Sequence, residues 1–291
     1  MTATANNQIL KIADLAIKLW SNNSVKIDIE TGYKQFVVDN DYGNIAIEIE
    51  VITPIPLELK NDDNMVFETN DDGKRLWHVC TFEDGYKVIV FNPLNTDEIQ
   101  QVAIISLQTK QWKIYAEQHS NTVIPLAYPM GPLIMYYLTV SNNAIMIHSS
   151  GIIDGNKGRL FSGFSGVGKS TMAQIWNDNG NTIINDDRLF LTIQNDRICM
   201  HNSPMFYDDK PKMHELNAIY LLKQTKENDI RRLTDAEAIS RLLAFCIQHG
   251  YDKQFLEHHL NMVFDIYNKI PIYELGFKPD AEIIDFIRTH E

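Results

Sequence analysis

The chain has 291 residues, of which 44% are hydrophobic, so it can bury roughly three quarters of its unfolded surface in one large or two modest domains. Its 26 basic and 38 acidic residues give a net charge of −12, without a cluster of basic residues, which argues against nucleic acid as a partner. No apolar stretch reaches the ~18 residues of a membrane span. The three cysteines lie far apart in apolar runs, which predicts buried, reduced thiols and a cytoplasmic protein.

The first 125 residues are expected to hold one helix and then a series of short strands. Apolar residues spaced as on one helical face predict a helix over residues 8–20. Apolar and polar residues then alternate, as between Ile45 and Val51, and Asp-Gly turns separate the runs. The expected strands cover residues 25–29, 45–51, 77–82, 86–91, 101–107 and 112–115. Residues 1–125 are thus predicted to form an antiparallel β domain.

From residue 126 to residue 291, helical and strand patterns alternate, which predicts a second domain of the α/β (α+β) class. Helices are expected over residues 131–140, 169–177, 252–269 and 281–289, and strands over residues 144–148, 159–162, 182–184 and 272–275. A further helix is expected to begin with a capping box of Thr234 and Glu237 and to end at Gly250. The adjacent His258 and His259 are expected on a helix surface.

Residues 163–170 read Gly-Phe-Ser-Gly-Val-Gly-Lys-Ser and match the pattern GxxxxGK[ST] of phosphate-binding loops. The residues before them predict a strand, and those after them predict an amphipathic helix that Gly180 ends. In this order, backbone N–H groups and the helix dipole converge on one anion. We therefore expect a nucleotide to bind at Gly163, Phe164, Ser165, Gly166, Val167, Gly168, Lys169, Ser170 and Thr171.

A second polar group, Asn185-Asp186-Asp187, begins 16 residues after Lys169 and follows a short apolar strand. We expect both carboxylates at the carboxyl edge of that strand, where ligands bind in α/β sheets. One acid could hold Mg²⁺ while the other accepts the proton of an attacking hydroxyl, and phosphoryl transfer needs both. An acidic pair by itself is more often a turn or a helix cap, but a phosphate loop nearby favours a role in the site.

Three segments together resemble the catalytic domain of HPr kinase/phosphorylase and its relatives, which share a nucleotide fold with ATP-dependent phosphoenolpyruvate carboxykinase. They are residues 148–152 (His-Ser-Ser-Gly-Ile), residues 163–170 and residues 185–187. The resemblance implies a P-loop nucleotide fold with a mixed sheet and helices, and ATP and Mg²⁺ as cofactors. It also implies a tendency to form homo-oligomers, although no interface pattern marks one in the sequence.

The resemblance further implies roles for single residues. Lys169 matches the lysine that neutralises the β and γ phosphates, and Ser170 matches the hydroxyl on Mg²⁺. Asp186 matches the catalytic base and Asp187 a carboxylate on the metal side, with the order of the two left open. His148 matches a histidine near the γ phosphate or the acids, its alternative being a hydrogen-bonded core histidine.

The sequence departs from this family in residues 1–125 and in the loop that engages the protein substrate. A polar stretch with Asp208, Asp209, Lys210 and Lys212 is a candidate replacement for that loop. Neither HPr as the substrate nor the carboxykinase reaction is therefore favoured. Transfer of the γ phosphate of ATP to a hydroxyl of a protein, a peptide or a small molecule is the predicted function. The alternative is a nucleotide-binding module without catalysis that reports its bound state to a partner.

Overall fold

The computed structural model describes residues 6–22, 25–39, 42–117, 121–204 and 209–291. The chain divides into two compact units, Met1–Ser141 with Pro204–Lys210, and Asn142–Ser203 with Pro211–Glu291. Helix α1 (Met130–Val140), which follows the expected boundary at residue 125, belongs to the first unit. Several sheets and helices make up the chain, in agreement with the predicted α/β (α+β) class.

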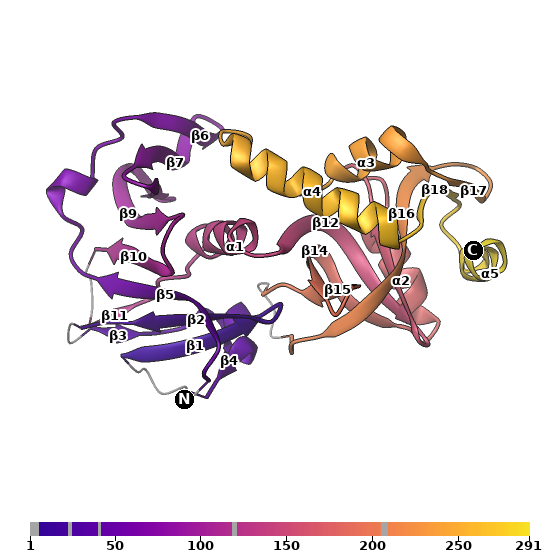
Figure 1. Cartoon of the computed structure of the whole chain (residues 1–291), viewed down its shortest axis with the longest axis horizontal. Coiled ribbons are helices and arrows are strands. Elements are labelled where there is room, and N and C mark those ends of the chain that lie inside the picture. The colour runs from indigo at the N-terminus through magenta and orange to yellow at the C-terminus, as the bar shows by residue number, and fades with distance from the viewer. Residues whose placement is uncertain (1–5, 23–24, 40–41, 118–120, 205–208) are drawn as a thin grey trace. The chain divides into compact units, whose positions relative to one another are not determined.

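The first unit is built on a nine-stranded sheet in the order β4-β1-β2-β5-β10-β9-β8-β7-β6 (Figure 1). The strands are β1 (Asn7–Ile12), β2 (Leu15–Trp20), β4 (Val37–Val38), β5 (Ile45–Ile52), β6 (Met65–Asp71), β7 (Lys74–Phe82), β8 (Gly85–Asn92), β9 (Asn95–Ser106) and β10 (Gln111–Ala116). The predicted antiparallel arrangement needs a correction, because β5 runs parallel to both β2 and β10. A separate parallel pair joins β3 (Lys26–Ile27) to β11 (Thr122–Val123), and two short 3-10 helices cover Thr31–Phe36 and Leu57–Leu59.

The helix predicted over residues 8–20 is wrong, because this segment forms the hairpin of β1 and β2. Ala13 and Asp14 make its two-residue turn with positive φ angles of 51° and 64°. The adjacent residues Ile9 and Leu10 are both buried, although neighbours on a strand point to opposite faces. A strand covered on both faces shows no alternation of apolar and polar residues, so its sequence is easily taken for a helix.

The second unit contains a seven-stranded mixed sheet in the order β13-β12-β14-β15-β16-β18-β17. Its strands are β12 (Ala144–Asp154), β13 (Lys157–Ser162), β14 (Thr182–Gln194), β15 (Arg197–Asn202), β16 (Met213–Gln224), β17 (Asp229–Arg232) and β18 (Ile272–Phe277). Because β16 pairs with β13 as well as with β15, the strands β13, β12, β14, β15 and β16 form a closed ring of pairings. Within the sheet, β13, β16 and β18 run parallel to one another.

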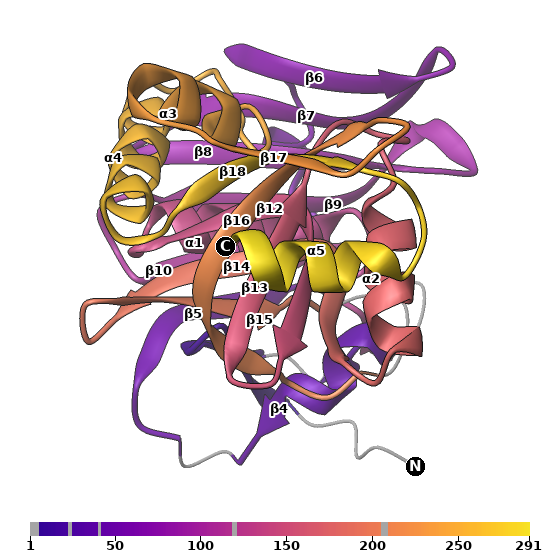
Figure 2. The same ribbon diagram turned by 90° about the vertical axis from the view of Figure 1, so that its right-hand side faces the viewer.

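Helices cover both faces of these parallel strands (Figure 2). On one face, Phe161 and Tyr220 pack with Trp176 of α2 (Lys169–Asp178) and with α5 (Glu282–His290). On the other face, Leu160 packs with Val263 and with helices α3 (Asp235–Leu243) and α4 (Lys253–Lys269). Neighbouring residues on β13 therefore enter different cores, as the two-residue repeat of a strand requires.

The ends of α3 and α4 test two of the capping predictions. Asp252 caps α4 as expected, since its side chain accepts a hydrogen bond of 2.6 Å from the Gln254 N–H group. Thr234 precedes α3 but its side chain makes no capping bond, and Glu237 pairs with Arg231 instead. The helix ends at Leu243, before Gly250, because residues 245–247 leave it to bond with the backbone of β12.

The cysteines and His259 test two further predictions about burial. The three cysteines are buried and free, as the sequence predicts. His259 was expected on a helix surface but is fully buried, and its ring bonds to the Phe255 and Ile247 carbonyl groups.

No helix in the described part of the chain is long and apolar enough to span a membrane.

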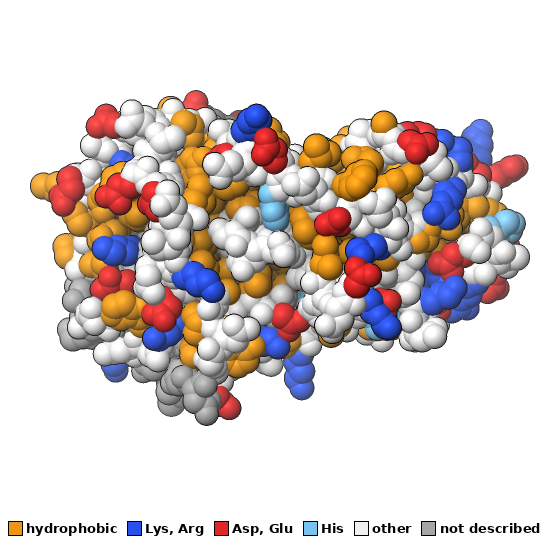
Figure 3. Space-filling model, in the orientation of Figure 1, with side chains coloured by type: hydrophobic (Ala, Val, Ile, Leu, Met, Phe, Trp, Pro, Cys, Tyr) orange, Lys and Arg blue, Asp and Glu red, His pale blue; other side chains and the backbone are white. Residues whose placement is uncertain are grey.

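Helix α4 also exposes apolar side chains, which are visible over it in the space-filling view (Figure 3). They are Leu256, Leu260 and Phe264, and their spacing of four residues places them on one side of the helix. All three residues lie outside the glycine loop and the acidic pair.

Candidate functional site

The glycine loop joins the carboxyl end of β13 to the first turn of α2, so the strand and the helix predicted around it are confirmed. Gly168 has a φ angle of 106°, and a Cβ atom there would lie 2.7 Å from Cζ of Phe277, at the end of β18. Gln224, at the end of β16, donates a hydrogen bond of 3.0 Å to the Gly166 carbonyl group. The loop therefore lies at the carboxyl edge of three parallel strands, the usual place for a ligand in such sheets.

The side chain of Lys169 is turned back onto the loop. Its ammonium group donates hydrogen bonds to the carbonyl groups of Gly163, at 3.0 Å, and of Phe164, at 3.2 Å. Burial lowers the pKa of Lys169, and the charges of Asp187 and Asp186 oppose that change. The loop lysine and both acids thus act on one another electrostatically, although they come from separate segments of the sequence.

The other loop residues differ in their exposure. Gly163 is buried and Val167 is half-buried, whereas Phe164, Ser165 and Gly166 are exposed. The first turn of α2 is open to solvent at Ser170 and Thr171, and its N-cap residue, Gly168, has no side chain to bond the free N–H groups. This end of α2 can therefore receive an anion and, at the Ser170 hydroxyl, a cation bound to that anion.

The acidic pair lies inside a strand and not at its end, which corrects the prediction from the sequence. The strand β14 continues from Thr182 to Gln194 because it pairs with β12 along its length, with Asp186 opposite Ser150 and Asp187 opposite Ser149. A register shift between Gly151 and Ile152 leaves Ile184 without an opposite residue in this pairing. Such a bulge changes the direction of neighbouring side chains and occurs often beside active sites.

Asp186 is held by two neighbours to which the sequence assigned no role. The Ser150 hydroxyl group donates a hydrogen bond to Oδ1 of Asp186 at 2.5 Å. The Asn185 side chain accepts a hydrogen bond of 2.7 Å from the Asp186 N–H group and donates one of 3.1 Å to Oγ of Ser203. Ser150 lies 36 residues before Asp186, so only the pairing of β12 with β14 reveals this contact.

Asp187 has a different set of partners. Its carboxylate lies 3.5 Å from Nε2 of His148 and 3.3 Å from Nε of Arg188. Burial lowers the pKa of His148, and the charge of Lys169 lowers it further, while Asp187 raises it. The imidazole is half-exposed beside Asp187, and its lowered pKa favours the neutral form near pH 7, which can accept a proton.

The polar stretch expected to replace a substrate loop is described only in part. Asp208 lies outside the described residues, and the division between the two units separates Asp209 and Lys210 from Lys212. Lys212 donates a hydrogen bond of 2.9 Å to the Ile183 carbonyl group in β14. Lys212 is thus fixed against the strand that carries the acids.

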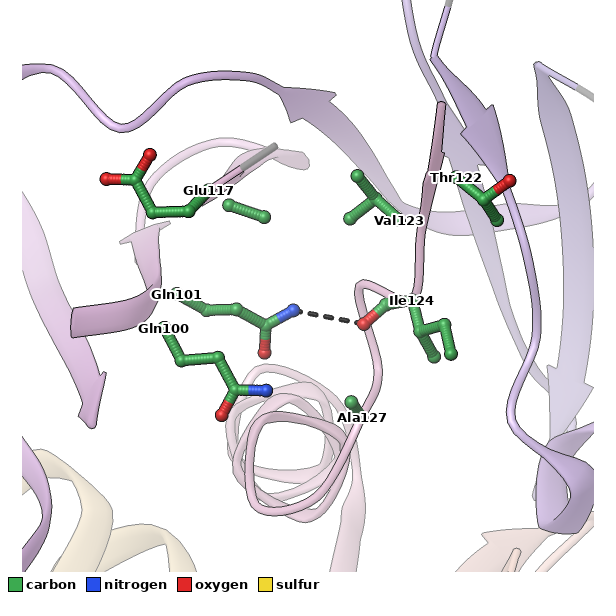
Figure 4. Close-up of a pocket in the computed structure, with 8 residues that line it drawn as sticks. Gln100, Gln101, Glu117, Thr122, Val123, Ile124 and Ala127 are labelled. Atoms are coloured by element: carbon green, nitrogen blue, oxygen red, sulfur yellow. Dashed lines mark hydrogen bonds between the residues drawn. The ribbon is translucent and has the colours of Figure 1, made fainter. Parts of the chain in front are cut away.

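A pocket of about 210 Å³ lies in the first unit (Figure 4). Gln101 crosses it and donates a hydrogen bond of 3.0 Å to the Ile124 carbonyl group. The lining residues are Gln100, Gln101, Ala116, Glu117, Thr122, Val123, Ile124 and Ala127. None of them belongs to the glycine loop or to the acidic pair, so this pocket is separate from the candidate site.

The donor groups for a metal are few. The described residues contain no group of three or more His, Cys, Asp and Glu side chains that could hold a metal ion. A magnesium ion needs no such group, because it is usually held by one or two protein oxygens together with substrate phosphates and water. The Ser170 hydroxyl and the Asp187 carboxylate are oxygen donors of this kind, and they fit that mode of binding.

No family model and no curated protein matches the chain. Among solved structures, the Hpr(Ser) kinase/phosphatase from Coxiella burnetii aligns with 50% of this chain and 95% of its own chain, at 13% sequence identity and a TM-score of 0.32. At so low a TM-score the similarity carries no functional argument.

Proposed function

We propose that the second unit is an ATP-dependent kinase that transfers the γ phosphate to a hydroxyl group. The observation that supports this function is that β12 brings the glycine loop and the acidic pair together. Ser149 lies opposite Ser162, which directly precedes the loop, on one side and opposite Asp187 on the other, and the charges of both acids act on Lys169. An anion site faced by two carboxylates is the arrangement that phosphoryl transfer requires.

The loop is proposed to bind the phosphates through the N–H groups of residues 163–171. Lys169 already bonds to two loop carbonyl groups, and it would exchange these partners for phosphate oxygens. Because a bond from an ammonium group to a phosphate is charge-assisted, the exchange favours the bound state. The role of the lysine is to neutralise charge on the β and γ phosphates.

Asp186 is proposed as the catalytic base that accepts the proton of the attacking hydroxyl. Its carboxylate is oriented by the Ser150 hydroxyl, and its backbone N–H group is bonded to the Asn185 side chain, so little reorganisation is needed when the acceptor binds. Ser170 and Asp187 would hold Mg²⁺, which neutralises phosphate charge when it is bound. His148 and Arg188 keep Asp187 in place through their contacts with its two oxygens.

The substitution Asp186→Asn tests this function. It removes the base while preserving size and hydrogen bonding, so turnover of labelled ATP should fall by about 10²-fold or more, as expected for loss of a general base. Calorimetric binding of Mg-ATP should remain within a few-fold of the parent. Asp265→Asn, at an exposed position on α4, is the matched control and should leave both quantities unchanged.

Two outcomes would contradict the proposal in different ways. If the Asp186→Asn variant turns over ATP at the parent rate, Asp186 is not the catalytic base. A parent protein that binds Mg-ATP but transfers phosphate to no acceptor would instead support a nucleotide-binding module that performs no chemistry.

A further inference from the structure

The glycine loop carries a large aromatic side chain that anion binding does not require. Phe164 is 75% exposed, although backbone N–H groups and Lys169 are the parts of the loop that bind phosphate. Its ring packs edge-to-face against Phe245, with the ring centroids 5.2 Å apart and an angle of 78° between the planes. This aromatic pair, Phe164 and Phe245, presents apolar surface at the edge of the candidate site.

The backbone of His148 connects the aromatic pair to the acids. The His148 N–H group donates to the Phe245 carbonyl group at 3.1 Å, and the Ser162 hydroxyl donates to the His148 carbonyl group at 2.7 Å. The imidazole of the same residue lies 3.5 Å from Asp187. The aromatic pair is therefore next to the side of the loop on which the acids lie.

The position of the pair indicates which part of a bound substrate it would meet. In phosphoryl transfer the acceptor hydroxyl lies next to the base and the terminal phosphate, whereas the nucleobase lies at the far end of the triphosphate. Building on the proposed kinase function, we propose that Phe164 and Phe245 form an apolar wall of the acceptor site. The acceptor would then carry an aromatic or large aliphatic group beside its hydroxyl.

The charges near the pair disfavour an acidic acceptor, and the exposed ring favours an apolar one. Asp186 and Asp187 place negative charge beside the hydroxyl position, so an acidic group next to that hydroxyl would be repelled. The exposed Phe164 ring would lose contact with water when it packs against an apolar group, which favours binding. A serine peptide with a bulky apolar neighbour and a small aryl alcohol share this chemistry.

Transfer of labelled phosphate from ATP to matched acceptors tests the inference on the full chain. One arm compares serine peptides in which the residue before the serine is Phe, Leu, Lys or Asp. The other arm compares 2-phenylethanol with glycerol. In the arm whose compounds are phosphorylated, kcat/KM should be on the order of tenfold higher for the apolar compounds than for the polar ones.

Substitution of the aromatic pair provides the structural test. Phe164→Ser removes an exposed side chain and should raise the KM for the apolar acceptor by on the order of tenfold, more than it raises the Kd for Mg-ATP. Phe245→Leu keeps apolar bulk at the half-buried partner and should have a smaller effect in the same direction. Leu260→Ser, an exposed apolar residue on α4, is the matched control and should change neither constant.

The outcomes separate this inference from the function on which it rests. Phosphate transfer without preference for apolar acceptors, or a Phe164→Ser variant that loses affinity mainly for ATP, would overturn the apolar wall and leave the kinase function standing. Absence of transfer to every acceptor, with Mg-ATP bound, would overturn both.

Discussion

Ser150 donates a hydrogen bond of 2.5 Å to Asp186 across the pairing of β12 and β14. Ser150 is fully buried, so its hydroxyl group has no competition from solvent, and the bond restricts the carboxylate to one orientation. The sheet itself thereby positions the proposed base.

Replacement of Ser150 by alanine should reduce turnover by about tenfold, because Asp186 would lose this orientation. The free energy of unfolding should fall by about 1–2 kcal/mol, as expected for loss of one buried hydrogen bond. Ser149→Ala is the matched control, since Ser149 is also buried and its hydroxyl donates to the Ile147 carbonyl group and not to a carboxylate. Steady-state kinetics and urea unfolding on both variants measure the two effects, and equal turnover in the pair would argue against a positioning role for Ser150.

Lys169→Ala should weaken binding of Mg-ATP by about 1–3 kcal/mol through the loss of a charge-assisted bond. The same change removes the two bonds that Lys169 makes to the Gly163 and Phe164 carbonyl groups, so the empty loop should also become less ordered. Calorimetric titration measures the affinity, with Lys253→Ala at an exposed position on α4 as the control. Parent-like affinity in Lys169→Ala would exclude this lysine from the phosphate site.

Three glycine-to-alanine substitutions should destabilise the fold to different degrees. At Gly168 the added Cβ atom meets both an unfavourable φ angle and the ring of Phe277, so the loss should be largest, about 2–4 kcal/mol. Gly180 has a φ angle of 82° but open space around it, and about 1 kcal/mol is expected. Gly250 shows neither constraint and should change little. Urea unfolding ranks the three, and a Gly168→Ala protein as stable as Gly250→Ala would contradict the described loop geometry.

His249 should make the second unit less stable in acid. Burial lowers its pKa from 6.5 to about 4, and the charge of His259 adds to this effect. Between these two values the unfolded chain binds more protons, so stability is retained above pH 6.5 and is lost as the pH falls toward 4. From pH 7 to pH 5 this group should contribute a loss of about 2 kcal/mol.

The variant His249→Gln cannot take up this proton and should lose less stability than the parent over the same pH interval. Urea unfolding at pH 7 and at pH 5 measures the difference, with His290→Gln at an exposed position on α5 as the control. Identical pH dependence in the parent and in His249→Gln would show that this histidine is not protected from protonation in the native state.

The parts of the molecule that could be predicted from sequence are those whose signals are local. The glycine loop could be found because its pattern GxxxxGK[ST] consists of residue types at fixed separations along the sequence. Asp252 identifies the start of α4 for the same reason, since a capping side chain bonds an N–H group two residues later. The class of the second unit followed from its alternating helical and strand patterns.

Other features depend on pairing between distant segments. The sequence predicts that Asn185-Asp186-Asp187 follow the end of a short strand, yet β14 continues through them because the backbone of β12 lies alongside. The turn of the first hairpin is Ala13-Asp14, which lacks the glycine that would mark it in the sequence. Only tertiary pairing distinguishes this hairpin from a helix.

The closed ring of β13, β12, β14, β15 and β16 has a consequence for how the proposed site could diversify. In a ring without a free edge, no strand can shift its register by one residue without breaking the hydrogen bonds to both neighbouring strands. The distance between the loop and the acids is therefore fixed by the strand pairings. Substitutions are tolerated more easily at exposed side chains of the loop, such as Phe164. Substitution of such exposed side chains could therefore change the preferred acceptor while the distance between the loop and the acids stays constant.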